Sequence, residues 1–352
     1  MYCLYLIVLC SSVTGIFQIY SKQTRRILIL LWFCLFVFIG TFAYFSDDYE
    51  PYAELAELVY ISPLSYTHVE PLWMWLIGLF NGNIDSFRFV SFLFLSILLL
   101  AVAKCAKTSL LYFLFCYTLL CMSTHICWIR QPIAYGVFLL GLLFLEKNKL
   151  VFVSFIILSL FIHKSAVLLM AVLPFLLFPL DKKTVLIYVL LAFPFALILF
   201  YSAILFIQNS LGIPLDFYLS AEGEYTDRNI VFSIILRLST IAQLLILGKV
   251  ILLFKEVSDV RILVRCLFGI AFVSILLIVL PIENNVISKR LLSLGSLLVA
   301  VICGIKVRNH FFEKKYLSLF VLILITIALR EINLLGNNYT TLDKLFRVPH
   351  LF

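Results

Sequence analysis

The chain has 352 residues, of which 64% are hydrophobic and only 13% are charged. Soluble domains carry about a quarter charged residues, so this composition excludes a soluble protein and predicts an all-α, polytopic transmembrane helical bundle. The net charge of +8 is expected in cytoplasmic loops and not on a nucleic-acid-binding surface, because no motif of interleaved basic and aromatic residues is present.

Apolar stretches long enough to cross a membrane recur along the whole chain, since a spanning helix needs about 20 residues. About twelve spans are predicted, in a single integral membrane domain over residues 1–352. The candidate spans are roughly 2–20, 27–45, 89–103, 109–129, 132–146, 150–163, 165–181, 184–205, 230–253, 262–280, 291–305 and 316–334. The first lacks a basic segment before it and a cleavage site after it, so it is predicted to be a retained span.

Basic residues lie in every second gap between these spans, and those gaps hold 17 of the 27 Lys and Arg residues. The positive-inside rule assigns the basic gaps to the cytoplasm and places both termini outside. Two larger loops are predicted on the outer side of the membrane, at about 46–88 and 206–229. In the first, the segment Leu72–Phe80 is apolar but too short to span, and Trp73 and Trp75 suit a membrane interface. A re-entrant or interfacial helix is predicted there.

Polar residues near the outer ends of the spans are the candidates for chemistry, because polar groups are costly to bury in a membrane. Asp48 lies where the second span ends, and its carboxylate suits a general base or a group that orients a substrate. The alternative is a solvated acidic loop without a function in the site.

Arg130 lies at the outer end of another span, next to Gln131. The planar fork of a guanidinium suits phosphate because it forms paired hydrogen bonds. The alternative is an anchor that reaches lipid headgroups. The other outer-side cations expected to converge on an anionic lipid headgroup are Arg237, Lys289, Arg290 and Arg330, and Glu283 lies in the same outer turn as Lys289 and Arg290.

His163 is predicted to lie below the outer surface. Only about 14 residues separate it from Lys149, which gives roughly 21 Å of helix against a membrane core of about 30 Å. A recessed imidazole, with an unperturbed pKa of about 6.5, suits a general base, and Lys164 lies at the same depth. The alternative is a hydrogen-bonded structural histidine.

Signatures of other enzyme classes are missing from the sequence. The nine cysteines form no CxxC pair, and there is no Walker A loop, G-x-S-x-G or H-E-x-x-H string. Neither a metal nor a cofactor is predicted.

Three stretches of the chain carry a family likeness. They are Asp47–Tyr49 with Tyr52 soon after, Glu70–Leu72 at the start of an aromatic segment, and Arg130–Ala134 followed some thirty residues later by Phe161–Ala166. These stretches resemble bacterial polysaccharide polymerases of the Wzy type, particularly the EpsG-like branch. The likeness runs from the first span to about residue 175.

The resemblance implies a glycosyltransferase of the bacterial inner membrane. It would polymerise polyprenyl-pyrophosphate-linked oligosaccharide repeat units into O-antigen, capsule or exopolysaccharide on the periplasmic face. The implied partners are membrane lipids and a flippase and chain-length regulator of the same pathway. Three alternatives remain: a lipid-linked glycan ligase or other membrane glycosyltransferase, a membrane O-acyltransferase that uses His163, and a flippase or other transporter.

In a polymerase of this kind, negative charge grows on the departing pyrophosphate and the acceptor hydroxyl loses a proton. These two changes suggest roles for the candidate residues. His163 is expected to act as the base or to contact the leaving group, and Asp48 is expected to position the acceptor sugar. Arg130 and Arg290 are expected to hold the pyrophosphate. The remaining residues expected to bind substrate are Glu70, Gln131, Lys164, Arg237, Glu283 and Lys289.

The alternation of basic gaps predicts the sidedness of the loops. Reporter fusions after Lys183 and Lys315 should show cytoplasmic activity, and a fusion near Glu222 should show periplasmic activity. Periplasmic activity at Lys183 or Lys315 would contradict the assignment of spans.

Overall fold

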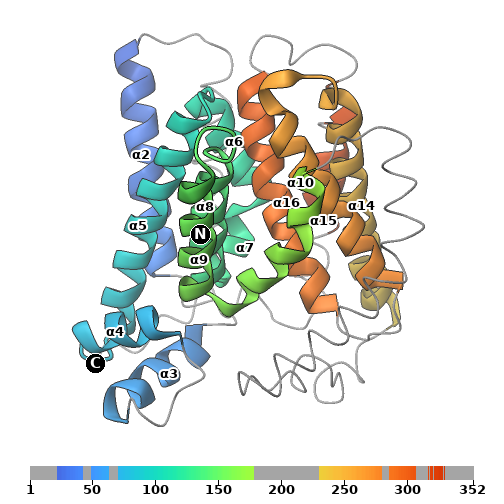
Figure 1. Ribbon diagram of the computed structural model, residues 1–352. Coiled ribbons are helices and arrows are strands. Elements are labelled where there is room, and N and C mark those ends of the chain that lie inside the picture. The colour runs from blue at the N-terminus through green and yellow to red at the C-terminus, as the bar shows by residue number, and fades with distance from the viewer. Residues whose placement is uncertain are drawn as a thin grey trace. The chain divides into compact units, whose positions relative to one another are not determined.

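The structure is a computed structural model that describes residues 22–42, 49–62, 70–177, 230–279 and 285–306, with parts of 316–329 (Figure 1). Every element in these ranges is a helix, which confirms the all-α class. Within these ranges, four helices are long and apolar enough to cross a membrane: Gln23–Thr41, Ile84–Cys105, Arg237–Phe254 and Ser288–Ile305. The total of about twelve spans remains a prediction. The candidate spans at 2–20 and 184–205 lie outside the described residues.

Contacts along the chain define two compact units. The first comprises Met1–Val167 and Ser296–Phe352, and the second comprises Leu168–Gly295. The single membrane domain over residues 1–352 remains a prediction.

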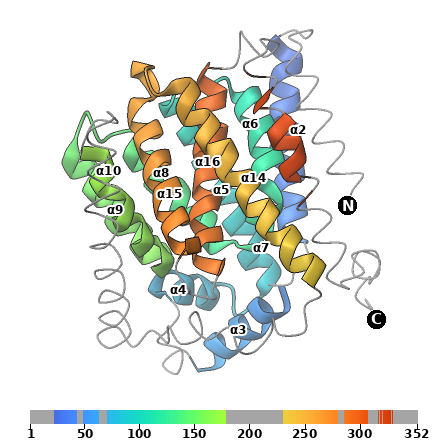
Figure 2. The ribbon, with the colours of Figure 1, turned by 90° about the vertical axis from the view of Figure 1, so that its right-hand side faces the viewer.

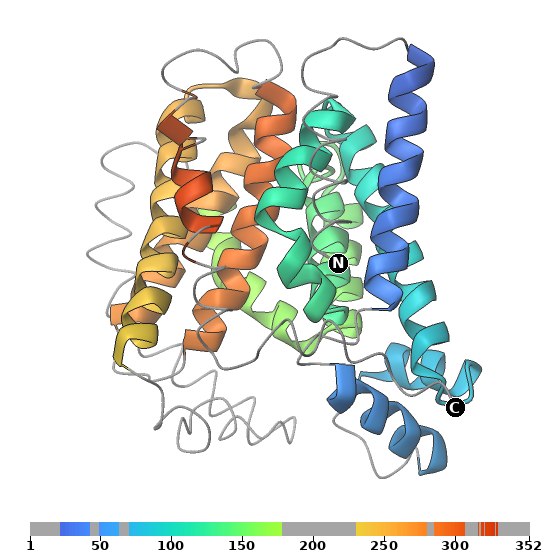
Figure 3. The same ribbon diagram turned by 180° about the vertical axis from the view of Figure 1, so that it is seen from behind.

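Four helices form the main layer of the first unit. They are α2 (Lys22–Thr41), α5 (Ile84–Cys105), α8 (Arg130–Leu142) and α9 (Lys149–Ile162). Helix α2 packs against α5, α5 against α8, and α8 against α9 (Figures 1 and 3). These helices contain few polar side chains, so neighbouring helices contact each other mainly through apolar side chains.

Glycines allow the close approach of α8 to its two neighbours. A Cβ atom at Gly136 would stand 2.6 Å from Leu98 Cδ2 on α5, and one at Gly141 would stand 2.5 Å from Phe155 Cβ on α9. Both distances are far below van der Waals contact. Small residues at helix crossings are typical of membrane proteins, where helix association depends on close packing.

Two predicted spans have a different local structure. The stretch expected as one helix at 109–129 divides into α6 (Leu110–Leu120) and α7 (Met122–Cys127), because Cys121 between them has φ −120° and ψ −37°. The stretch expected at 165–181 begins as a 3-10 helix, η2 (Lys164–Val172), and continues as α10 (Leu173–Leu177).

The first predicted loop contains two short helices, which lie together where α2 ends and α5 begins (Figure 1). Helix α4 (Pro71–Leu79) covers the stretch where a short helix was predicted, and its re-entrant or interfacial placement remains a prediction. Pro71 starts the helix at a position where a missing N–H is harmless. Helix α3 (Tyr49–Ile61) lies in the same predicted loop, where no helix was expected at these residues.

The two tryptophans of α4 have different environments. Trp75 is 62% exposed, as expected for an interface, whereas Trp73 is only 2% exposed and belongs to the core. The expectation for Trp73 was therefore wrong. Residues two apart in an α-helix are separated by about 200° around its axis, so Trp73 and Trp75 lie on nearly opposite faces of α4.

In the second unit, α14 (Ile230–Phe254) and α10 both pack against α15 (Arg261–Val279), as Figure 2 shows for α14 and α15. A 3-10 turn, η4 (Ser258–Val260), connects α14 to α15. Helix α16 (Asn285–Lys306) begins in this unit and continues into the first.

Arg88 of α5 holds the end of α2. Its Nε and Nη2 donate to the Gly40 carbonyl at 2.9 and 2.6 Å, and Nε also donates to the Thr41 carbonyl at 3.2 Å. The guanidinium is completely buried and lies over the Tyr49 ring, 5.3 Å from its centre. Since the last carbonyls of a helix have no partner within it, Arg88 satisfies the C-terminus of α2 with a side chain from another helix.

Replacing Arg88 with Met should destabilise the first unit by about 3 kcal/mol, because the buried carbonyls of α2 lose charged hydrogen-bond donors. Thermal unfolding in detergent measures the change. Lys104→Met on the exposed side of α5 is the control. Equal melting temperatures for the two variants would contradict the capping role.

Candidate functional site

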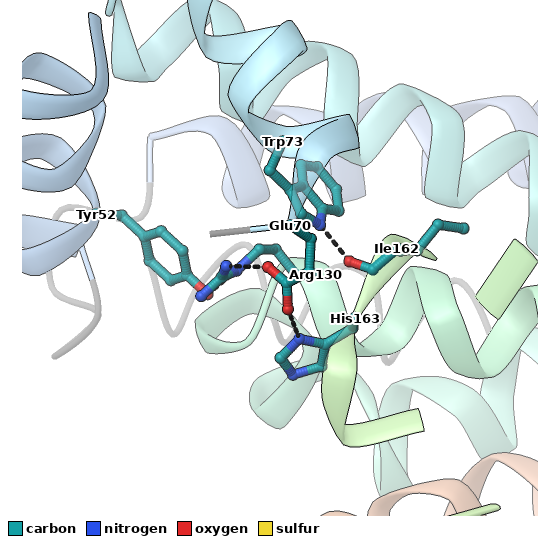
Figure 4. Close-up of polar contacts among 6 residues, drawn as sticks. All are labelled: Tyr52, Glu70, Trp73, Arg130, Ile162 and His163. Atoms are coloured by element: carbon teal, nitrogen blue, oxygen red, sulfur yellow. Dashed lines mark hydrogen bonds and ion pairs between the residues drawn. The ribbon is translucent and has the colours of Figure 1, made fainter. Parts of the chain in front are cut away.

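The first unit contains a carboxylate that joins an arginine and a histidine from distant parts of the chain. Glu70 Oε2 accepts from Arg130 Nη1 at 2.6 Å, and Glu70 Oε1 is 2.8 Å from His163 Nδ1 (Figure 4). The three side chains are 5%, 19% and 12% exposed, respectively. Two of the predicted substrate-binding residues and the predicted base are therefore in direct contact.

The local structure of α4 and α9 brings Glu70 to His163. Glu70 immediately precedes α4, and its carbonyl accepts from the Trp73 and Met74 amides. Trp73, on the first turn of α4, donates its indole N–H to the Ile162 carbonyl at the last residue of α9. This bond fixes the start of α4 against the end of α9, so Glu70 and His163 meet.

His163 stands at a break between two helices. It follows α9 with an extended backbone, φ −154° and ψ 121°, and its amide donates to the Ser159 carbonyl at 3.0 Å. The 3-10 helix η2 starts at the next residue. A side chain at such a break leaves the regular face of α9, which is why it reaches Glu70.

Arg130 is held by a second residue from the first loop. Its Nε donates to the Tyr52 hydroxyl at 3.1 Å, and its guanidinium carbon lies 5.2 Å from the centre of the Tyr52 ring. Tyr52 belongs to α3, whereas Arg130 begins α8. Tyr52 and Glu70 thus both orient this guanidinium.

Glu70, Arg130 and His163 form a cluster in which the carboxylate is paired with both of the other side chains. A shielded carboxylate is costly unless it is paired, and Glu70 has a donor on each oxygen. Because the carboxylate accepts from Nδ1–H, the neutral imidazole of His163 carries its lone pair on Nε2. A histidine oriented by a carboxylate can accept a proton at Nε2, and a guanidinium beside it can bind an anion.

The structure places the other predicted site residues as follows. Gln131 is buried and donates its amide N–H to the Tyr135 hydroxyl within α8. Arg237 is exposed on α14, and Lys289 and Arg290 are half-buried near the start of α16. These three belong to the second unit, so their convergence with Arg130 remains a prediction. Asp48, Glu283, Arg330 and the side chain of Lys164 lie outside the described residues.

Two residues that position the cluster, Tyr52 and Trp73, were not assigned a role in the site from the sequence. Tyr52 was noted only as part of the family likeness, and Trp73 was taken for an interfacial residue. No sequence signal marks the Trp73 bond, because its partner is a backbone carbonyl 89 residues away. In the part of the chain that the structure describes, no group of three or more His, Cys, Asp or Glu residues could hold a metal ion.

Coupling between Arg130 and Glu70 should be measurable. Glu70→Ala leaves the guanidinium in a shielded position without its carboxylate, so it should cost about 3 kcal/mol of unfolding free energy. Adding Arg130→Ala should recover 1–3 kcal/mol, roughly, since neighbouring mutations are not additive. Thermal unfolding in detergent measures both, with Glu57→Ala, on the exposed side of α3, as control. Additive losses would show that the ion pair contributes nothing.

Comparison with known proteins gives one family. A search of curated proteins and a search of solved structures each find no match. The EpsG family matches residues 25–342, which includes Tyr52, Glu70, Arg130 and His163. The match confirms the resemblance seen in the sequence and identifies a membrane protein related to polysaccharide biosynthesis. The chain belongs to the EpsG family.

Proposed function

We propose that this protein is a glycosyltransferase that polymerises polyprenyl-pyrophosphate-linked oligosaccharide repeat units. The observation that carries the proposal is the Glu70 carboxylate bound to both Arg130 and His163. Glycan transfer from a lipid pyrophosphate needs a group that takes a proton and a group that stabilises a departing anion. In the cluster, His163 can take the proton and Arg130 can stabilise the anion, and both contact the same carboxylate.

His163 acts on the acceptor. Its Nε2 takes the proton of a sugar hydroxyl as the hydroxyl oxygen bonds to the anomeric carbon of the donor. Glu70 stabilises the imidazolium that forms, because the Nδ1–H already donates to Oε1 at 2.8 Å. The carboxylate remains ionised throughout, as is usual for a carboxylate that orients a histidine.

Arg130 acts on the donor. The bond between the anomeric carbon and the pyrophosphate oxygen breaks, and the electron pair leaves with polyprenyl pyrophosphate. The guanidinium has five N–H donors, so it can hold Glu70 and Tyr52 and also donate to the pyrophosphate. A fixed, partly shielded cation stabilises this charge more than a solvated one does.

Further residues complete the proposed substrate site. Asp48 would orient the acceptor sugar, and Lys164 and Gln131 would bind beside His163 and Arg130. Arg237, Glu283, Lys289 and Arg290 would contribute charge from the later spans. Lipid-linked substrates would reach the site from the outer leaflet of the inner membrane, and both termini would face the periplasm.

Replacing Arg130 with Lys should lower the rate of polymerisation about 100-fold, because a point charge cannot reproduce the fork of donors. Purified protein and lipid-linked repeat units provide the assay, with polymer length read on a gel. Glu57→Gln, on the exposed side of α3, is the matched control. Full-length polymer from Arg130→Ala at normal protein level would refute the role of Arg130.

Replacing His163 with Ala should lower the rate at least about 100-fold while binding of the lipid-linked donor persists, since a general base contributes about 10²–10⁴-fold. Asp48→Asn should mainly raise the acceptor concentration that is needed. If Asp48→Asn is inactive at saturating acceptor while His163→Ala polymerises normally, the two roles are reversed.

A further inference from the structure

Helix α3 meets two arginines through two tyrosines one turn apart. Tyr49 lies against Arg88, with 5.3 Å between the guanidinium carbon and the ring centre, and Tyr52 lies against Arg130 at 5.2 Å. Residues three apart share a face of a helix, so one face of α3 carries both contacts. The two arginines differ in surroundings: Arg88 is completely buried, whereas Arg130 is 19% exposed.

The hydroxyl groups of the two tyrosines have different partners. The Tyr49 hydroxyl donates to Asp85 Oδ1 at 2.9 Å, whereas the Tyr52 hydroxyl accepts from Arg130 Nε at 3.1 Å. A phenolic oxygen that accepts a hydrogen bond still has its own proton to donate. The Tyr52 hydroxyl therefore has a proton to donate beside the Arg130 guanidinium.

We propose that Tyr52 is a positioning residue for the lipid-linked substrate, and that it acts by fixing the plane of the Arg130 guanidinium and by donating its hydroxyl proton to a pyrophosphate oxygen. This inference rests on the proposed function, because it takes the anion at Arg130 to be the pyrophosphate. Tyr49 is the structural counterpart, which holds α3 to Arg88 and Asp85 and takes no part in anion binding.

The geometry explains why Arg130 needs this support. Glu70 holds one end of the guanidinium at Nη1, and a hydrogen bond at Nη1 does not by itself fix the plane of the group. The Tyr52 ring covers the face, and its hydroxyl holds Nε. Two edges and one face are then fixed, so the fork is oriented before substrate arrives. Preorganised donors lose less entropy on binding than mobile ones do.

The test compares three variants of the full chain in detergent. Tyr52→Phe keeps the ring and loses the hydroxyl, Tyr52→Leu loses both, and Tyr49→Phe is the matched control on the same face of α3. Binding of polyprenyl pyrophosphate and the KM and kcat for the lipid-linked donor are measured for each. Thermal unfolding reports any loss of structure.

Tyr52→Phe should weaken binding of polyprenyl pyrophosphate about tenfold, as expected for a lost hydrogen bond to a charged group, and raise the donor KM with it. Tyr52→Leu should weaken binding further, and Tyr49→Phe should bind within about twofold of the natural protein even where its melting temperature falls. Unchanged binding by Tyr52→Phe, or equal losses in Tyr52→Phe and Tyr49→Phe, would overturn the proposal.

The outcomes also separate this inference from the proposed function. If the natural protein binds polyprenyl pyrophosphate, and loses that binding on Tyr52→Phe, yet joins no repeat units, the polymerase activity is refuted and the role of Tyr52 stands. If the protein polymerises normally with Tyr52→Phe at every donor concentration, the role of Tyr52 is refuted and the polymerase activity stands.

Discussion

A shielded carboxylate must be paired, and the pairing of Glu70 determines how the first unit is assembled around its site. The two oxygens of this side chain bind Arg130, 60 residues away, and His163, 93 residues away. Helices α4, α8 and the end of α9 therefore meet at one group, and α3 joins them through Tyr52. Loss of any one partner leaves an unpaired charge or polar group, which makes the cluster a single structural unit.

The same pairing links structure to chemistry. An isolated histidine at the end of a helix could adopt either tautomer, and an isolated arginine there could turn toward lipid headgroups. Contact with Glu70 selects the tautomer that can accept a proton at Nε2, and it pairs the guanidinium with a carboxylate of the same unit. The sequence left two alternatives open, a structural role for His163 and a lipid-anchoring role for Arg130. The structure joins these two residues through the Glu70 carboxylate.

In the described part of the chain, the predicted spans overlap the four helices long and apolar enough to cross a membrane, α2, α5, α14 and α16, because lipid requires long apolar stretches. Helix α3 was missed, since its tyrosines and carboxylates gave no apolar run. Arg130 and His163 were chosen as site residues from charge and depth, and Glu70 from the family resemblance, but their contact was not predicted. Pairing over 60 and 93 residues depends on how the helices pack, and a single sequence does not reveal it.

The buried guanidinium of Arg88 has a consequence for the order in which the chain enters the bilayer. An arginine raises the free energy of inserting a helix by about 2.5–3.5 kcal/mol near its centre, and less toward its end. Its partners Gly40 and Thr41 belong to α2, which leaves the ribosome before α5. The acceptors for this charge are therefore already synthesised when α5 reaches the translocon. A circular permutant that moves α2 to the C-terminus would reverse this order and expose Arg88 to lipid during biogenesis.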